Sequence, residues 1–119
     1  MLEARFIPMR ICALFLLLCM TVPMAAAEHT IAVVGLVHSH VWGHLNKMIQ
    51  GKPAKLVGVA ETEPMLKAEA QKRGVPAELI SADWKKMIDE KQPEMVWAFV
   101  ENNRHREIVE YCAPRKIHV

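Results

Sequence analysis

The 119-residue sequence predicts an α/β fold built on a doubly wound parallel sheet. Two observations support this prediction. Residues 31–35, 55–60 and 95–100 are almost continuously apolar, which is typical of strands buried on both faces of a parallel sheet. Segments with helical spacing of apolar residues alternate with these strands in units of roughly 20–25 residues, and such units favour parallel pairing. We therefore expect the strand order 3-2-1-4-5.

The first two helices have clear start and stop signals. Apolar residues recur at helical spacing over residues 41–49, and the sequence Gly-Lys-Pro at 51–53 ends that helix. After the strand over 55–60, Thr62 or Glu63 is expected near the next helix cap, with Pro64 in the first turn. Gly74, which follows two basic residues, is a good residue to end this helix.

The second half of the chain continues the alternation. Residues 78–80 predict a short third strand, and Ser81 is expected to cap the helix that follows. The apolar stripe of that helix consists of Trp84, Met87 and Ile88. A fourth strand over 95–100 precedes a helix marked by Ile108, Val109 and Cys112. Residues 116–119 begin a fifth strand, so we expect the sheet to be incomplete at the C-terminus.

The first 27 residues have the parts of a secretory signal peptide. Arg5 and Arg10 precede a stretch, residues 11–27, that carries no charge, and Pro23 is followed by three alanines. We expect cleavage after Ala27 and export to the periplasm or the extracellular space. The alternative is an uncleaved membrane anchor, since this stretch approaches the ~20 residues needed to span a bilayer. Residues 28–119 then form the single mature domain.

The mature chain is nearly neutral and holds one cysteine. It keeps thirteen basic and twelve acidic side chains, a balance that gives no electrostatic case for binding nucleic acid or an anionic membrane surface. Cys12 and Cys19 lie in the predicted signal, so Cys112 has no partner for an internal disulfide. Its apolar surroundings favour a core residue over a nucleophile.

The loop after the first strand is the first candidate binding site, because ligands of open parallel sheets bind beyond the carboxyl ends of the strands. In a dinucleotide loop three glycines are expected, and only Gly35 is in register, with His38 and His40 near the other two positions. The following helix N-terminus and the hydroxyl of Ser39 still suit a phosphate. The alternative is a purely structural turn.

The same loop also suggests a metal site. His38, His40 and His44 place three imidazoles within seven residues, and an i, i+4 spacing puts the last two on one helix face. A non-catalytic exported module that binds a metal through this loop is therefore the alternative function.

Two further strand ends carry polar residues. Glu61 follows the second strand, 26 residues beyond Gly35, where a carboxylate can accept hydrogen bonds from an adenosine ribose and disfavours a 2′-phosphate. This favours NAD over NADP, although an acidic residue is also stabilised at a helix N-terminus for electrostatic reasons alone. After the fourth strand come Asn102 and His105, and Asn is also a common helix cap.

Taken together, the order and spacing of these motifs resemble the N-terminal domain of the glucose–fructose oxidoreductase / inositol dehydrogenase (Gfo/Idh/MocA) family. The shared segments are residues 31–35 with their loop, residues 56–61 with Pro64, the helix ending at Gly74, residues 83–88 and residues 93–96. Residues 100–105, Val-Glu-Asn-Asn-Arg-His, stand where the family has T-P-N-x-x-H. The resemblance covers about residues 30–119.

The resemblance implies a Rossmann-like domain that binds NAD or NADP, with NAD favoured. In the family a second domain binds a sugar, a polyol or a related substrate, and hydride passes between that substrate and the nicotinamide. The implied cofactor-binding residues are Gly35, Leu36, Val37, His38, Ser39, His40, Glu61, Asn102 and His105. The sequence departs from the family in lacking the later glycines, the Thr-Pro step and the E-K-P segment with its lysine. We therefore expect the chain alone to be inactive.

Overall fold

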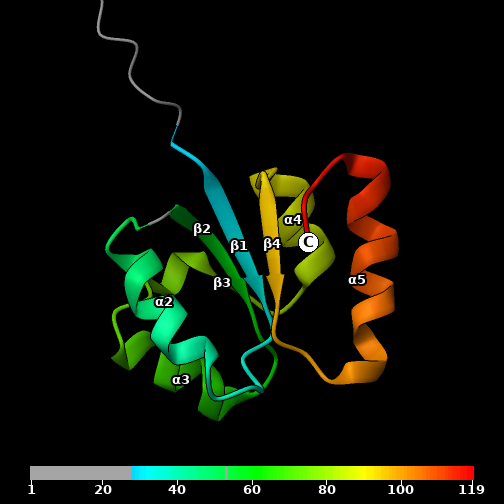
Figure 1. The fold of residues 1–119 in the computed structure, drawn as a ribbon. Coiled ribbons are helices and arrows are strands. Elements are labelled where there is room, and N and C mark those ends of the chain that lie inside the picture. Colours follow the sequence, from blue (N-terminus) through cyan, green and yellow to red (C-terminus); the bar gives the residue numbers. More distant parts are fainter. Residues whose placement is uncertain (1–27, 53) are drawn as a thin grey trace, which may run out of the picture.

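The computed structural model describes residues 28–52 and 54–119, so the predicted signal peptide lies outside the described residues. Four strands pair in parallel in the order β3-β2-β1-β4 and form one sheet (Figure 1). The strands are β1 (Thr30–Val34), β2 (Lys55–Ala60), β3 (Ile80–Ser81) and β4 (Met95–Ala98). The predicted doubly wound α/β class and the order of these four strands are confirmed.

Helices cover both faces of the sheet. They are α2 (Val41–Ile49), α3 (Pro64–Lys72), α4 (Trp84–Lys91) and α5 (His105–Cys112). In Figure 1, α2 and α3 lie on one side of the sheet and α4 and α5 on the other. Because the chain changes faces between β3 and β4, the strand order reverses between the neighbours β1 and β4. Ligands of such sheets bind at this reversal.

The alternation of side chains along β1 separates two cores. Ile31 and Val33 point into a core shared with the apolar faces of α2 and α3. Ala32 and Val34 point the other way, into a core shared with α4 and α5. Cys112 is fully buried in this second core, as predicted from its apolar surroundings.

The carboxyl ends of β1, β2 and β4 lie at one edge of the sheet. Val34, the last residue of β1, pairs with Ala60 on one side and with Ala98 on the other. The register of β1 on β2 shifts between Ile31 and Ala32, which leaves Val57 without a partner on β1. The segments that follow these strand ends therefore begin side by side.

Most of the predicted helix signals are confirmed. The first helix spans Val41–Ile49, and α3 is capped by Glu63, whose side chain accepts a hydrogen bond from the Met65 amide. Pro64 lies in the first turn of α3, and Gly74 follows the C-cap with φ of 102°, a conformation that glycine adopts readily.

Three local predictions need correction. Residues 78–80 are mostly not a strand, because a 3₁₀ turn occupies Ala77–Leu79 and β3 is the two-residue segment after it. Asp83, not Ser81, caps α4, because its carboxylate accepts hydrogen bonds from the amides of Lys85 and Lys86. The fourth strand ends at Ala98, two residues earlier than predicted.

The predicted fifth strand is present as a single bridge. His118 pairs in parallel with Met95 on the side of β4 opposite β1, which is the position expected for a fifth strand. Its amide donates to the Glu94 carbonyl at 3.0 Å, and its carbonyl accepts from Val96 at 2.7 Å. Sheet pairing beyond β4 therefore begins where the order 3-2-1-4-5 requires.

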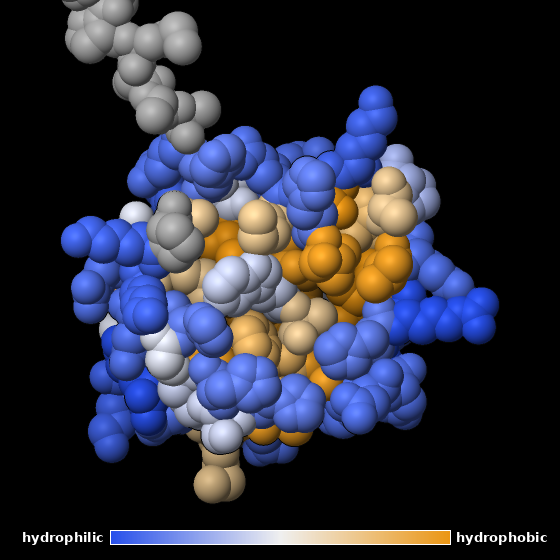
Figure 2. Space-filling model, viewed as in Figure 1, coloured by the Kyte–Doolittle hydropathy of each residue, from blue (hydrophilic) through white to orange (hydrophobic). Residues whose placement is uncertain are grey.

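Apolar side chains gather on the face of the molecule shown in Figure 2, between α2 and α5, with hydrophilic residues around them. No helix lies in front of β4 in this view (Figure 1), and Met95 and Trp97 of β4 are only partly buried against the first core. Within the described ranges, every helix is too short or too polar to cross a membrane.

Candidate functional site

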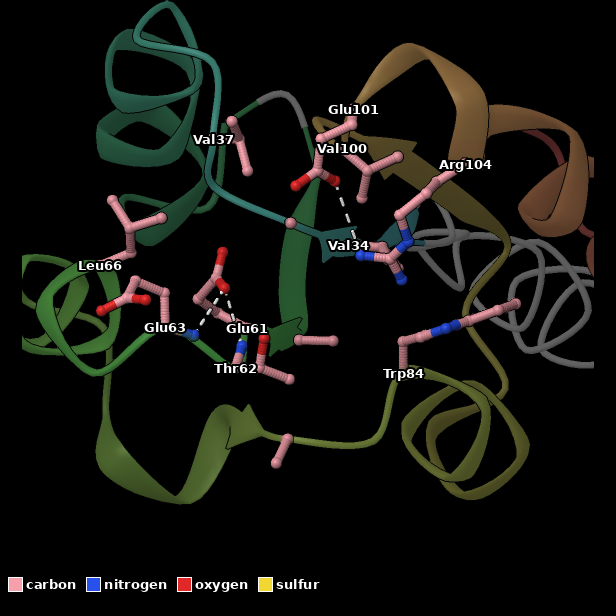
Figure 3. Close-up of a pocket in the computed structure, with 13 residues that line it drawn as sticks. Val34, Val37, Glu61, Thr62, Glu63, Leu66, Trp84, Val100, Glu101 and Arg104 are labelled. Atoms are coloured by element: carbon pink, nitrogen blue, oxygen red, sulfur yellow. Dashed lines mark hydrogen bonds and ion pairs between the residues drawn. The ribbon is translucent and has the colours of Figure 1, made fainter.

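A cleft of about 290 Å³ opens at the carboxyl ends of β1, β2 and β4. Its wall combines the ends of these strands with the starts of the segments that follow them (Figure 3). The lining residues are Val34, Gly35, Val37, Ala60, Glu61, Thr62, Glu63, Leu66, Ala82, Trp84, Val100, Glu101 and Arg104. The cleft therefore lies at the strand-order reversal, where the fold predicts a ligand site.

Gly35 forms the turn at the end of β1 and lines the cleft, and its conformation and close neighbours favour glycine at this position. Its φ is 80°, in the region that favours glycine. A Cβ atom at this position would lie 2.5 Å from Cγ1 of Val100 and 3.0 Å from the Phe99 carbonyl oxygen. The glycine thus lets the segment after β4 approach the end of β1.

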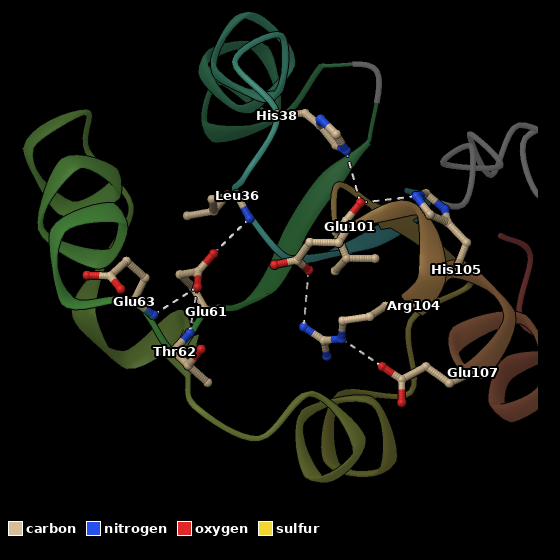
Figure 4. A network of polar contacts seen from close by, with 10 residues as sticks. Leu36, His38, Glu61, Thr62, Glu63, Glu101, Arg104, His105 and Glu107 are labelled. Carbon is tan, nitrogen blue, oxygen red and sulfur yellow. Dashed lines mark hydrogen bonds and ion pairs between the residues drawn. The ribbon is translucent and has the colours of Figure 1, made fainter.

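Glu61 is the one buried charged residue of the described chain, with 7% of its surface exposed. Its carboxylate is held by three backbone amides (Figure 4). Oε2 accepts from Leu36 at 2.8 Å, and Oε1 accepts from Thr62 at 2.7 Å and from Glu63 at 2.9 Å. These charge-assisted bonds offset the cost of burying the carboxylate and tie the loop after β1 to the end of β2.

The carboxylate of Glu61 still has acceptor capacity. An ionised carboxylate offers about four lone-pair positions, two on each oxygen. Oε1 uses two of them and Oε2 uses one. One acceptor position on Oε2 is therefore left for a hydroxyl donor, and Glu61 lines the cleft.

The predicted loop residues divide into two groups. Gly35 and Val37 line the cleft, whereas Leu36, His38, Ser39 and His40 do not. The Leu36 side chain is buried and its amide is bonded to Glu61, while the Val37 amide donates to the Phe99 carbonyl at 3.1 Å. Ser39 and His40 are exposed at the start of α2, and His40 makes no side-chain capping bond there.

His38 and His105 have structural partners. Nε2 of His38 lies 2.9 Å from the Val100 carbonyl oxygen, and Nε2 of His105 lies 3.1 Å from the same atom (Figure 4). A carbonyl oxygen only accepts, so both rings donate from Nε2. His105 and the exposed Asn102 do not line the cleft, although both lie next to its wall after β4.

The three imidazoles of the first loop do not converge on a common point. His38 stacks on His40 with ring centroids 5.7 Å apart, and His44 packs instead against Trp97 at 5.1 Å. Among the described residues, no three His, Cys, Asp or Glu side chains are arranged to hold a metal ion. The geometry gives no support to the alternative metal site.

The cleft also contains residues that the sequence analysis did not select. Trp84, at the start of α4, forms part of the wall, and its ring packs edge-to-face on Tyr111 at 5.0 Å. Among the described residues, Arg104 is the only cation that lines the cleft, beside the carboxylates of Glu61, Glu63 and Glu101. The sequence could have indicated Arg104, because it lies after the fourth strand between Asn102 and His105, two of the predicted cofactor-binding residues.

Comparison of the chain with models of protein families, with curated proteins and with solved structures finds no match.

Proposed function

We propose that this domain binds an NAD-type dinucleotide in the cleft at the ends of β1, β2 and β4. The observation that carries the proposal is the buried Glu61 carboxylate, which lines the cleft and keeps one acceptor position on Oε2. A ribose hydroxyl is a donor of suitable size and polarity for that position. The cofactor residues predicted at Gly35 and Val37 lie in the same wall.

The loop after β1 supports the same proposal. Gly35 lines the cleft, and because it has no side chain the segment after β4 packs against the end of β1 and shapes the cleft wall. The start of α2 lies after the same loop and has no side-chain cap, and the positive end of a helix dipole favours an anion. These features fit the adenosine and phosphate parts of a dinucleotide.

The charges of the cleft favour NAD over NADP. Glu61 and Glu63 follow directly after β2, so a 2′-phosphate on a ribose held there would meet two carboxylates. A ribose with free hydroxyls would instead donate to Glu61. The cleft therefore favours NAD over NADP in two ways, because it repels the additional phosphate of NADP and binds the free ribose hydroxyl of NAD.

The resemblance to the Gfo/Idh/MocA family extends the proposal to an exported oxidoreductase that acts on a sugar, a polyol or a related substrate. A bound dinucleotide supplies the hydride chemistry, and the protein contributes position and electrostatics. In this chain Glu61 orients the ribose, and Gly35 lets the segment after β4 form the neighbouring wall of the cleft. His38 and His105 fix the segment after β4 against the loop after β1.

Calorimetric titration of the full chain with NAD and NADP tests the proposal. We expect NAD to bind at least about tenfold more tightly than NADP, since each charged contact contributes on the order of 1 kcal/mol or more. Glu61→Gln should reduce that ratio. Glu69→Gln is the matched control, because Glu69 of α3 pairs with Arg73, the C-cap of that helix, and does not line the cleft. Equal affinity for both dinucleotides, or no binding of NAD, would contradict the proposal.

A further inference from the structure

Arg104 is placed to meet the phosphates of a ligand in this cleft. It lies in the short 3₁₀ helix Asn102–Arg104 that follows β4, and Figure 3 shows its guanidinium reaching into the cleft. The remaining charged residues of the lining, Glu61, Glu63 and Glu101, are all acidic. Within the described part of the chain, a phosphate entering this cleft therefore has one cation to pair with.

The two ion pairs of Arg104 differ in kind. Nε donates to Oε1 of Glu107 at 2.8 Å, and Glu107 does not line the cleft. Nη1 lies 3.7 Å from Oε2 of Glu101, a separation too long for a hydrogen bond. Glu107 therefore orients the guanidinium, while Glu101 neutralises it without using the hydrogen-bond donors of its terminal nitrogens.

Glu101 is suited to be displaced. Its side chain is 54% exposed and that of Arg104 is 41% exposed, so their attraction is screened by solvent. Two phosphate oxygens form shorter, bidentate contacts with a guanidinium than this carboxylate does. Replacing the Glu101 contact with a phosphate contact is thus favourable for Arg104, while the displaced carboxylate remains beside the bound anion and lowers the net gain.

On the basis of the proposed function, we infer that Arg104 binds the phosphates of the nucleotide and that Glu101 occupies this guanidinium in the free protein. Glu101 is then a built-in competitor that limits the affinity for nucleoside diphosphates. Glu107 is a positioning residue. Arg104 and Glu101 together set the affinity of any nucleotide whose diphosphate reaches Arg104. They do not affect the affinity of an uncharged nucleoside.

The experiment compares ADP with adenosine by NMR titration of the full chain, because the two ligands differ only in the diphosphate. We expect Arg104→Gln to weaken ADP binding about tenfold and to leave adenosine binding unchanged. Arg104→Lys should retain part of the ADP affinity. Glu101→Gln should strengthen ADP binding about threefold and leave adenosine unchanged.

Arg106→Gln is the matched control. Arg106 lies on α5, two residues after Arg104, and pairs with Glu110 at 2.6 Å, and neither residue lines the cleft. This variant should bind both ligands as the natural chain does. The inference is overturned if Arg104→Gln binds ADP normally, or if it loses adenosine and ADP affinity equally, which would show a structural role. If the natural chain binds neither ligand, the proposed function fails together with the inference.

Discussion

His38 and His105 donate hydrogen bonds to the same acceptor, the carbonyl oxygen of Val100, at 2.9 and 3.1 Å. His38 comes from the loop after β1 and His105 is the first residue of α5. Two segments separated by more than sixty residues are thus joined at the end of β4. This junction fixes the edge of the sheet where the cleft opens.

Because they share an acceptor, the two histidines should contribute to the free energy of unfolding in a coupled way. Replacing either one by alanine leaves the carbonyl with one donor, and each single change should cost about 0.5–1.5 kcal/mol of unfolding free energy. Replacing both leaves the carbonyl without a protein donor, so the double variant should lose more than the sum. Urea denaturation of the four proteins measures this difference. If the losses of unfolding free energy in the two single variants add up to the loss in the double variant within about 0.3 kcal/mol, this would argue against a shared acceptor.

Replacing glycine by alanine should have opposite effects on the stability of the chain at Gly35 and at Gly43. Gly35→Ala should destabilise the chain by about 2–4 kcal/mol, because the residue has φ of 80° and its Cβ would overlap Val100. Gly43→Ala should stabilise it by about 0.5–1 kcal/mol, since Gly43 lies in α2 with nothing within 4 Å of a Cβ. Thermal melts of both variants provide the test, and equal melting temperatures would refute the turn geometry.

Cys112 should be unreactive in the folded chain. Its thiol is buried in the second core, and burial raises its pKa above the ordinary value, although Arg115 opposes this slightly. Little thiolate is then present at neutral pH. Alkylation followed by peptide mapping should modify Cys112 only after denaturation. Rapid modification of the native protein at this residue would contradict the assignment as a core residue.

Asp89 should titrate below its usual range because Tyr111 donates to it at 2.6 Å. This hydrogen bond is the largest single cause that lowers the pKa of Asp89, and the hydrogen bond and the charge of Arg115 lower it further. Since the folded pKa is depressed, the stabilising contribution is present above the unfolded pKa and is lost as the pH falls through the folded value. NMR titration of the carboxyl carbon should show the pKa of Asp89 rising in Tyr111→Phe and rising also in Arg115→Gln. An unchanged value in Tyr111→Phe would exclude the hydrogen bond as its cause.

The strands and most helices could be predicted from local pattern. The apolar runs that form β1, β2 and β4 are nearly continuous, as expected for strands buried on both faces of a sheet. Pro64 marks the start of α3, and Gly74 follows its C-cap. Asp83 was missed as a cap because Ser81 comes first and has the same capping tendency. The serine hydroxyl instead accepts from the Asp83 amide at 3.2 Å.

The site was less predictable because its contacts are long-range. Sequence selects Glu61 as a carboxylate after a strand, but nothing local indicates that its Oε2 accepts from Leu36, twenty-five residues away. That contact depends on the register of β1 against β2, including the shift near Ile31. Likewise, His38 is a candidate ligand residue in the sequence, and only the folded chain directs its ring to Val100.

NMR titration of the ¹⁵N-labelled full chain with NAD shows whether the cleft at the ends of β1, β2 and β4 holds a dinucleotide. We expect saturable shifts of the amides of Gly35, Thr62 and Glu101, which line the cleft. The amides of Thr30 and Met95, where β1 and β4 begin at the opposite edge of the sheet, should keep their positions. If the cleft signals do not move at millimolar NAD, or if the shifts are concentrated at the opposite edge, the cleft is not the dinucleotide site.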